Sequence, residues 1–346
     1  MDTAFLTGAT GFIGANLVRT LLEKGLKVRA LARPGGNRKN IEGLPVDIVE
    51  GDLLDRRTLL DGCRGARYVF HVAADYRIWV PDPEAMYAAN VEGTVNVMKA
   101  AGAAGVERVV HCSSVAAVKP LPGGAASEDS HYAGAREIIG PYKKSKWLSE
   151  RAALETAREG VPVVVVNPAA PIGPRDVKPT PTGKIVVDFL NRRMPSYVDT
   201  GLNVVHVRDV AEGHYLAALK GAVGQRYILG CENLTLKRIL DILSDVTGLP
   251  APRFKTPYAL AWAFGALDSA RLRLFGGTPI APLDAVRMAR HRMFYDSGKA
   301  VRELGLPQTP ARTALRDAAD WFCGNGYAPL HPKAADRAAD ERIAAP

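Results

Sequence analysis

Short apolar runs alternate with longer amphipathic stretches over the first half of the chain. The runs at 3–7 and 27–32 predict buried strands, and the stretch 16–24 between them predicts a helix that stops before Gly25. Further apolar runs end near residues 71, 112 and 166. This alternation predicts an α/β fold in which a doubly wound parallel sheet is covered by helices on both faces.

The pattern changes after residue 168. Residues 169–204 are expected to be rich in loops, with a helical piece at 185–192, while 204–207 and 226–229 are expected to be strands that return to the sheet. Before this change, residues 115–141 contain Pro120, Pro122, Gly123 and Gly124 and are expected to form a long active-site loop. Thr235 is expected to cap a helix through Val246. We therefore expect a first domain from 1–168 plus about 205–230, a smaller, mostly helical domain from 169–204 plus 231–330, and a polar tail at 331–346.

Three glycines lie between the first strand and the first helix, at positions 8, 11 and 14. A strand, a glycine turn and a helix in this order are the context of a dinucleotide-binding turn. Gly8 would permit the tight turn, Gly11 the approach of a pyrophosphate, and Gly14 the close packing of helix on strand. The helix N-terminus would then face the phosphates.

The residue after the second strand discriminates between cofactors. An NAD site usually has a carboxylate about 20 residues past the glycines, where it binds the ribose 2′-hydroxyl. This chain has Arg33 instead, and a guanidinium group suits a 2′-phosphate. The sequence therefore predicts NADP in preference to NAD, with a solvated arginine at a strand end as the alternative.

Tyr142 and Lys146 are four residues apart, which places both side chains on one face of a helix. A free phenol has a pKa near ~10. A neighbouring ammonium group would lower that pKa and make the pair an acid/base for moving a hydroxyl proton. The alternative is an ordinary solvated helix face.

Together these motifs resemble the extended short-chain dehydrogenase/reductase family, over about residues 3–328. The resemblance is carried by Thr7–Gly14, Gly51–Leu53, His71–Ala74, Asn90–Thr94, Cys112–Ser114 and the Tyr142/Lys146 pair. It implies a Rossmann-type fold. Within the family the chain looks similar to the hopanoid-associated sugar epimerases, which are relatives of the plant dihydroflavonol reductases, in segments 71–79, 168–175, 178–183 and 197–201.

The resemblance implies a role for particular residues of this chain. The implied catalytic residues are Ser114, Tyr142 and Lys146. The implied cofactor contacts, beyond Tyr142, Lys146 and Arg33, are Gly8, Thr10, Gly11, Phe12, Ile13, Gly14, Asp52, Leu53, Ala73, Ala74, Asn90 and Pro168. Candidate substrate contacts, each of which has packing or solvation as its alternative, are Asp75, Tyr76, Trp79, Lys178, Lys184 and Tyr197.

Two activities would use these catalytic residues. The first is an NAD(P)-dependent reductase or dehydrogenase that transfers hydride at a ketone or secondary alcohol; the second is a sugar or sugar-nucleotide epimerase that oxidises a hydroxyl and reduces it again. Arg33 favours net reduction, and Asn167 stands where sugar-nucleotide epimerases often carry arginine. A protein that binds NADP without turnover is a third hypothesis, which the presence of both Tyr142 and Lys146 disfavours.

Composition narrows the remaining choices. The four cysteines form no C-x-x-C pair and the seven histidines no ligand spacing, so we expect a reducing, cytoplasmic environment and no metal. We expect no signal peptide, and the chain has no uninterrupted apolar run of the ~18 residues that a membrane span needs. The net charge of +9 is dispersed, which favours anionic ligands or an anionic surface over nucleic acid. We expect a small-molecule substrate, lipid-linked or sugar, and leave a homodimer open.

Residues 258–275 have a separate pattern. Apolar and aromatic side chains occur throughout, together with Arg271 and Arg273. The segment is too short and too charged to span a bilayer, but an interfacial helix that makes peripheral contact with a membrane has this composition. The alternative is a buried helix of the smaller domain.

Overall fold

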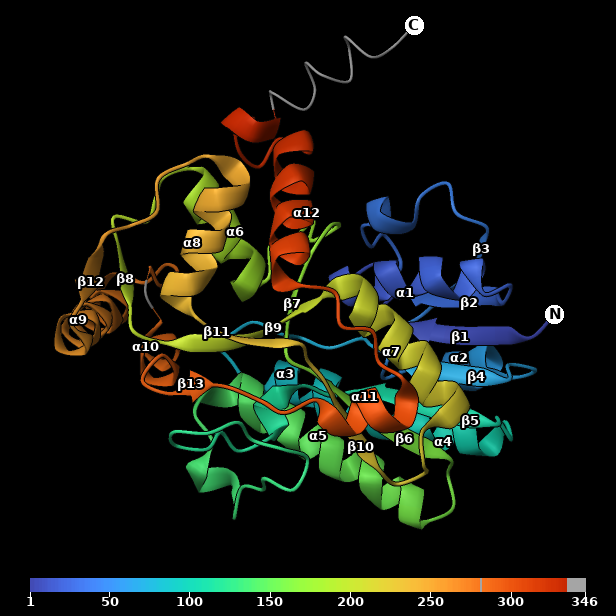
Figure 1. Ribbon diagram of the computed structural model, residues 1–346. Coiled ribbons are helices and arrows are strands. Elements are labelled where there is room, and N and C mark those ends of the chain that lie inside the picture. The colour runs from blue at the N-terminus through green and yellow to red at the C-terminus, as the bar shows by residue number, and fades with distance from the viewer. Residues whose placement is uncertain (281, 335–346) are drawn as a thin grey trace, which may run out of the picture. The chain divides into compact units, whose positions relative to one another are not determined.

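The computed structural model describes residues 1–280 and 282–334, and the chain forms two compact units (Figure 1). The first unit contains Met1–Ala169, Arg208–Gly230 and Tyr295–Pro307. The second contains Ala170–Val207, Cys231–Phe294 and Gln308–Pro346. Most of the expected polar tail, from residue 335 on, lies outside the described residues.

A seven-stranded parallel sheet is the centre of the first unit, as the alternating pattern predicts. Its strand order is β10 (Arg226–Leu229), β6 (Val163–Pro168), β5 (Arg108–Cys112), β4 (Tyr68–His71), β1 (Thr3–Thr7), β2 (Lys27–Ala32) and β3 (Val46–Glu50). The chain winds outward from β1 to β3 and then returns to β4 on the other side of β1. Doubly wound sheets bind ligands at such a reversal, outside the carboxyl ends of the strands.

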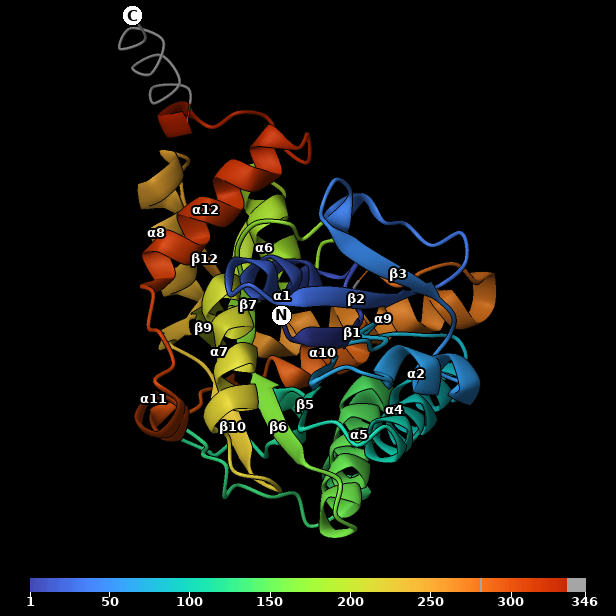
Figure 2. The same cartoon turned by 90° about the vertical axis from the view of Figure 1, so that its right-hand side faces the viewer.

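Helices cover both faces of this sheet (Figure 2). One face carries α2 (Arg56–Cys63), α4 (Gly93–Ala103) and α5 (Gly140–Arg158), whose apolar side chains form one core with the strands. The other face carries α1 (Phe12–Glu23) and α7 (Val207–Lys220), joined by an ion pair of 2.8 Å between Lys24 and Glu212. Coverage on both faces explains why Val163–Val166 are all buried, since strands inside such a sheet have no solvent face.

The second unit has a smaller sheet in which β9 (Gly201–His206) pairs with β7 (Ala170–Ile172), β11 (Glu232–Thr235) and β13 (Arg292–Met293). A separate parallel pair joins β8 (Ser196–Val198) to β12 (Phe254–Thr256). The helices are α6 (Pro181–Leu190), α8 (Leu236–Thr247), α9 (Tyr258–Phe275), α10 (Leu283–Met288) and α12 (Ala311–Gly324). Helices α6, α8 and α12 pack together over one apolar core (Figure 1).

Three sequence expectations need correction. The strand expected at 204–207 belongs to β9 and the second unit's sheet, because it pairs with β7 and β11 rather than with the central strands. The helix expected at 185–192 begins earlier, at Pro181, because Thr180 caps it and proline is tolerated in the first turn. Residues 295–307 belong to the first unit, where α11 (Gly298–Leu304) packs on β10 and the Asp296 amide donates to the Ala126 carbonyl at 2.9 Å.

Candidate functional site

The turn between β1 and α1 is built so closely that only glycine fits at two positions. Gly8 has a φ of 79°, and a Cβ added there would lie 2.5 Å from the Ala73 nitrogen. A Cβ at Gly14 would lie 2.0 Å from the Gly8 carbonyl oxygen. Helix α1 follows at Phe12, and no side chain caps its first amides. A bare, glycine-lined helix start fits the pyrophosphate of a dinucleotide, which Thr10–Gly14 would hold through backbone N–H groups.

The residues expected around an adenosine follow β2 and β3 at the same edge of the sheet. Arg33 comes directly after β2 and is exposed. Arg38, in the same loop, instead forms an ion pair with Glu50. Asp52 follows β3, is exposed and accepts a hydrogen bond of 3.0 Å from the Leu54 amide. Leu53 is partly buried beside Gly93 at the start of α4.

Asn90 fixes the loop that follows β4 and carries Ala73 and Ala74. Its Oδ1 accepts from the Asp75 amide at 2.7 Å, and its Nδ2 donates to the Asp75 carbonyl at 2.9 Å. The same Nδ2 lies 2.9 Å from the Ser145 hydroxyl on α5. Asn90 therefore links this loop to the helix that carries Tyr142 and Lys146, and in this structure it acts as a positioning side chain.

A buried polar chain continues below Asn90. The Thr94 hydroxyl donates to the Asn90 carbonyl at 2.6 Å and lies 2.9 Å from His71 Nε2. His71 Nδ1 lies 2.7 Å from the Thr7 hydroxyl at the end of β1. Burial lowers the pKa of His71 to about 3, so the imidazole is neutral and joins the ends of β1 and β4.

Ser114 and Tyr142 meet at the carboxyl end of β5. Ser114 follows that strand, and Tyr142 lies in the first turn of α5. Burial raises the pKa of Tyr142 to about 12, and a side-chain hydrogen bond with Ser114 opposes this with a smaller lowering. The phenol is therefore protonated at neutral pH and is a proton donor in this state.

Lys146 lies one helical turn beyond Tyr142, as the spacing predicts, and its Nζ donates to the Cys112 carbonyl at 2.7 Å. Burial lowers the pKa of Lys146 from its ordinary value. The expectation that this ammonium lowers the Tyr142 pKa is wrong for this structure, because desolvation of the phenol is the larger effect and Ser114 is the partner that opposes it.

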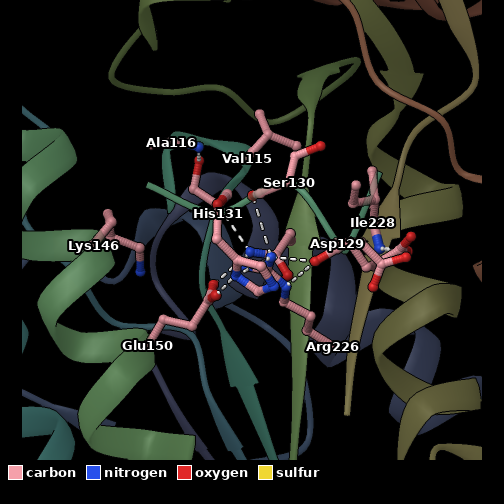
Figure 3. Close-up of polar contacts among 12 residues, drawn as sticks. Val115, Ala116, Asp129, Ser130, His131, Lys146, Glu150, Arg226 and Ile228 are labelled. Atoms are coloured by element: carbon pink, nitrogen blue, oxygen red, sulfur yellow. Dashed lines mark hydrogen bonds and ion pairs between the residues drawn. The ribbon is translucent and has the colours of Figure 1, made fainter. Parts of the chain in front are cut away.

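A buried ion pair that the sequence did not predict joins Glu150 on α5 to Arg226 on β10 (Figure 3). Glu150, one turn beyond Lys146, accepts from Arg226 Nη1 at 2.8 Å and from Asn167 Nδ2 at 2.6 Å. Asn167 Nδ2 also donates to the Ser114 carbonyl at 3.0 Å. Arg226 donates from Nε to the Glu128 carbonyl at 2.8 Å. The network thus connects α5, β6 and β10 to the loop after β5, and it fixes the position of Ser114 in that loop.

Two signals in the sequence could have found this network. Arg226 is a charged residue within an otherwise apolar strand, and such a charge is buried only with a partner. Glu150 continues the four-residue spacing of Tyr142 and Lys146 along one helix face. Asn167, which stands where the sequence analysis noted an arginine in sugar-nucleotide epimerases, is fully buried and donates to Ser114 and Glu150. Pro168 ends β6 beside it.

The candidate substrate residues after β4 have mixed surroundings. Asp75 is bound through its backbone to Asn90 and through its carboxylate to Arg77, whose Nε lies 3.0 Å away. Tyr76 is partly buried, and Trp79 is exposed over 36% of its surface. Tyr76 and Trp79 therefore remain predicted substrate contacts. Asp75 instead forms hydrogen bonds that order its own loop.

The other three candidates belong to the second unit. Lys184 forms an exposed i,i+4 ion pair of 2.6 Å with Asp188 on α6, the arrangement of a solvated helix face. Lys178 is exposed, and Tyr197 packs against the second unit's core. Packing at that core is the alternative to substrate contact that the sequence analysis gave for Tyr197.

Comparisons with known proteins give one consistent result. A profile of the NAD dependent epimerase/dehydratase family matches residues 4–230. The chain is 48% identical to a "Putative dihydroflavonol 4-reductase" of Synechocystis sp. over 94% of its length and 96% of the relative. It is 38% identical to "Sterol demethylase protein B" of Methylococcus capsulatus over 94% of its length and 99% of the relative.

A solved structure supports the same fold. It is PA4631 of Pseudomonas aeruginosa, described as a nucleoside-diphosphate-sugar epimerase, which is 27% identical to this chain. The TM-score is 0.79, with 94% of this chain and 99% of that structure covered.

Proposed function

Because the chain belongs to the NAD-dependent epimerase/dehydratase family, a family of enzymes, we propose that it is an NADP-dependent reductase that converts a ketone to a secondary alcohol. The observation that carries this proposal is the protonated phenol of Tyr142, hydrogen-bonded to Ser114 one turn from Lys146. NADPH, when bound, supplies the hydride. The same family membership argues against the hypothesis of an NADP-binding protein without turnover.

The chain's own residues would supply the proton and hold the substrate oxygen. In this proposal Tyr142 donates its phenolic proton to the carbonyl oxygen as negative charge develops there. Ser114 donates a hydrogen bond to the same oxygen, and Lys146 holds the cofactor ribose. General acid help of this kind contributes typically ~10²–10⁴ in rate.

The preference for NADP rests on Arg33. Its exposed side chain follows β2, where an NAD site usually has a carboxylate. A guanidinium group can bind a phosphate with two parallel hydrogen bonds. A reductase must release the oxidised cofactor and bind the reduced one in each turnover. NADPH, as a cellular reductant, suits such an exchange.

We propose a cyclic, largely apolar ketone as the substrate. The names of the two relatives refer to a dihydroflavonol and to a sterol, both of them fused-ring compounds. A hopanoid-related lipid is a further fused-ring compound of that class. It is included because the sequence resembles the hopanoid-associated group of the family. Tyr76 and Trp79 supply aromatic surface near the end of β4.

A second candidate function is a sugar or sugar-nucleotide epimerase, which the likeness to PA4631 favours. An epimerase would use Ser114, Tyr142 and Lys146 in both directions, first to take a hydroxyl proton and then to return it. The two functions therefore differ in net cofactor consumption and not in catalytic residues.

The test is to incubate the protein with NADPH and a panel of cyclic ketones, and to follow the nicotinamide absorbance. We expect stoichiometric NADPH consumption, and Tyr142→Phe should lower kcat by at least ~10² while leaving the Kd for NADPH within about twofold, because only the proton donor is lost. Tyr215→Phe, which removes a hydroxyl on α7, is the matched control.

Two results would contradict the proposal. Isomer interconversion of a sugar nucleotide without net NADPH loss would identify an epimerase. Unchanged turnover in Tyr142→Phe would remove the tyrosine from the chemistry altogether.

A further inference from the structure

Helix α9 in the second unit leaves a long apolar face uncovered. Leu260, Phe264, Leu267 and Leu274 recur at helical spacing on one face and are exposed over 62, 53, 71 and 76% of their surfaces. An adjoining side of the helix contains the buried Gly265 and Asp268, and α9 packs on α10. We call these four side chains, with Phe275 at 80% exposure, the α9 apolar face.

The exposed apolar surface does not end with the helix. Phe254, just before α9 in the chain, and Ile280, just after it, are exposed over 76 and 73%. Asp268 fixes the returning segment, because its carboxylate accepts from the Ile280 amide at 2.6 Å and from Arg271 Nε at 2.9 Å. A row of exposed apolar side chains along one helix face marks an interaction site, whereas single exposed side chains do not.

The charge around this face is one-sided. Residues 253–292 contain seven arginine or lysine residues and two aspartates. Asp199, outside this segment, pairs with Lys255 at 2.7 Å and with Arg292 at 3.3 Å, so the segment and this partner together carry a net charge of +4. Asp268, the one acidic residue in α9, is buried and bound, and Asp284 pairs with Arg287 at 3.3 Å. Arg253 and Arg290 are exposed at either end of the segment. An approaching anionic surface would therefore meet cations and apolar side chains.

These features favour a lipid surface over the other occupants of an apolar face. A second copy would bring the same net charge of +4 against itself, which disfavours self-association. The distance from Leu260 to Leu274 is about 21 Å along the helix, so the helix would lie along a membrane surface. No helix in the described part of the chain is long and apolar enough to cross a membrane.

We propose that the α9 apolar face docks on the surface of membranes that contain anionic lipids. The apolar side chains would enter the boundary between head groups and acyl chains, and the surrounding arginine and lysine residues would bind lipid phosphates. Docking would bring a lipid-soluble substrate within reach of the enzyme, but the proposal does not depend on the identity of that substrate or on turnover.

The test is flotation of the full-length protein with vesicles of phosphatidylcholine and phosphatidylglycerol at about 3:1, and with phosphatidylcholine alone. We expect flotation with the anionic vesicles at low salt, and a loss of bound protein as the salt concentration rises, because salt screens the charge attraction. Leu260→Glu with Leu267→Glu should reduce the bound fraction about tenfold or more, since both side chains lose their apolar contact.

The matched control is Leu219→Glu with Val223→Glu, which changes two exposed apolar residues of the first unit by the same charge. This variant should float like the wild type, and Arg253→Gln with Arg290→Gln should weaken flotation on anionic vesicles. The proposal is overturned if the wild type stays unbound with both vesicles, or if the two Glu variants lose binding equally. It is also overturned if light scattering shows a dimer that only the α9 variant dissociates, because the face would then bind a second copy.

Discussion

At the scale of single residues, the proposed preference for NADP depends on Arg33. Its neighbour in the loop, Arg38, is held by Glu50, so the two arginines have different surroundings despite their proximity in sequence. The sequence separates them only by their position after the strand. The structure leaves Arg33 as the exposed cation directly after β2.

Replacing Arg33 by serine should therefore weaken NADPH binding and leave NADH binding nearly unchanged. Hydrogen bonds to charged groups contribute about 1.5–3 kcal/mol each, so we expect the Kd for NADPH to rise about 10- to 100-fold. Titration followed by calorimetry measures both constants. Arg38→Ser is the control and should change either Kd by less than about threefold; a wild type that binds NADH more tightly would refute the assignment.

At the scale of secondary-structure elements, α5 carries both Tyr142 and Lys146, which we propose take part in the reaction, and Glu150, which supports them. Tyr142, Lys146 and Glu150 follow one another at intervals of four residues on this helix. The last of them connects α5 to β10 through Arg226 and to β6 through Asn167. A change at Glu150 should consequently affect both the stability of the fold and the position of Ser114.

We expect Glu150→Gln to lower the free energy of unfolding by about 3–5 kcal/mol, because it leaves the Arg226 charge buried without its partner. Glu155→Gln on the same helix is the control. Its ion pair with Arg158 is exposed and should contribute at most about 1 kcal/mol. Urea unfolding measures the difference, and equal losses in the two variants would contradict a structural role for the buried pair.

At the scale of the whole molecule, three buried histidines make the first unit sensitive to acid. His71 and His111 stack with ring centroids 5.3 Å apart, and His214 Nδ1 lies 2.7 Å from the Val210 carbonyl. Burial lowers the pKa of His71 to about 3 and of His214 to about 4, and it holds the pKa of His111 well below its ordinary value. All three imidazoles are therefore neutral in the folded state at neutral pH.

The sign of the pH dependence follows from these shifts. Between pH 6.5 and about 4 the unfolded chain binds a proton at each histidine that the folded chain does not, so stability is full above pH 6.5 and falls with acidification. Each histidine contributes a slope of about 1.4 kcal/mol per pH unit. His214→Gln should reduce the slope by that amount in urea unfolding at pH 6, 5.5 and 5, whereas an unchanged slope would mean that His214 is charged in the fold.

Local chemistry determined much of this protein from the sequence alone. The glycine turn, the placement of Arg33 after a strand and the Tyr142–Lys146 spacing depend on residues within a few positions of each other, so their geometry follows from helix and strand periodicity. The order of these motifs also predicted the doubly wound sheet and the family, both of which are confirmed. The capping of α8 by Thr235 was predicted for the same local reason.

Only the tertiary structure decided the contacts between residues that are distant in the chain. Arg226 and Glu150 are 76 positions apart, and β9 joins the second unit's sheet because of partners that a local pattern does not contain. The Tyr142 pKa depends on burial, which is a property of the packed molecule, and so the expected effect of Lys146 was wrong. The exposure of α9 likewise required the fold, because an apolar helix has the same sequence pattern whether its second face is covered or open to solvent.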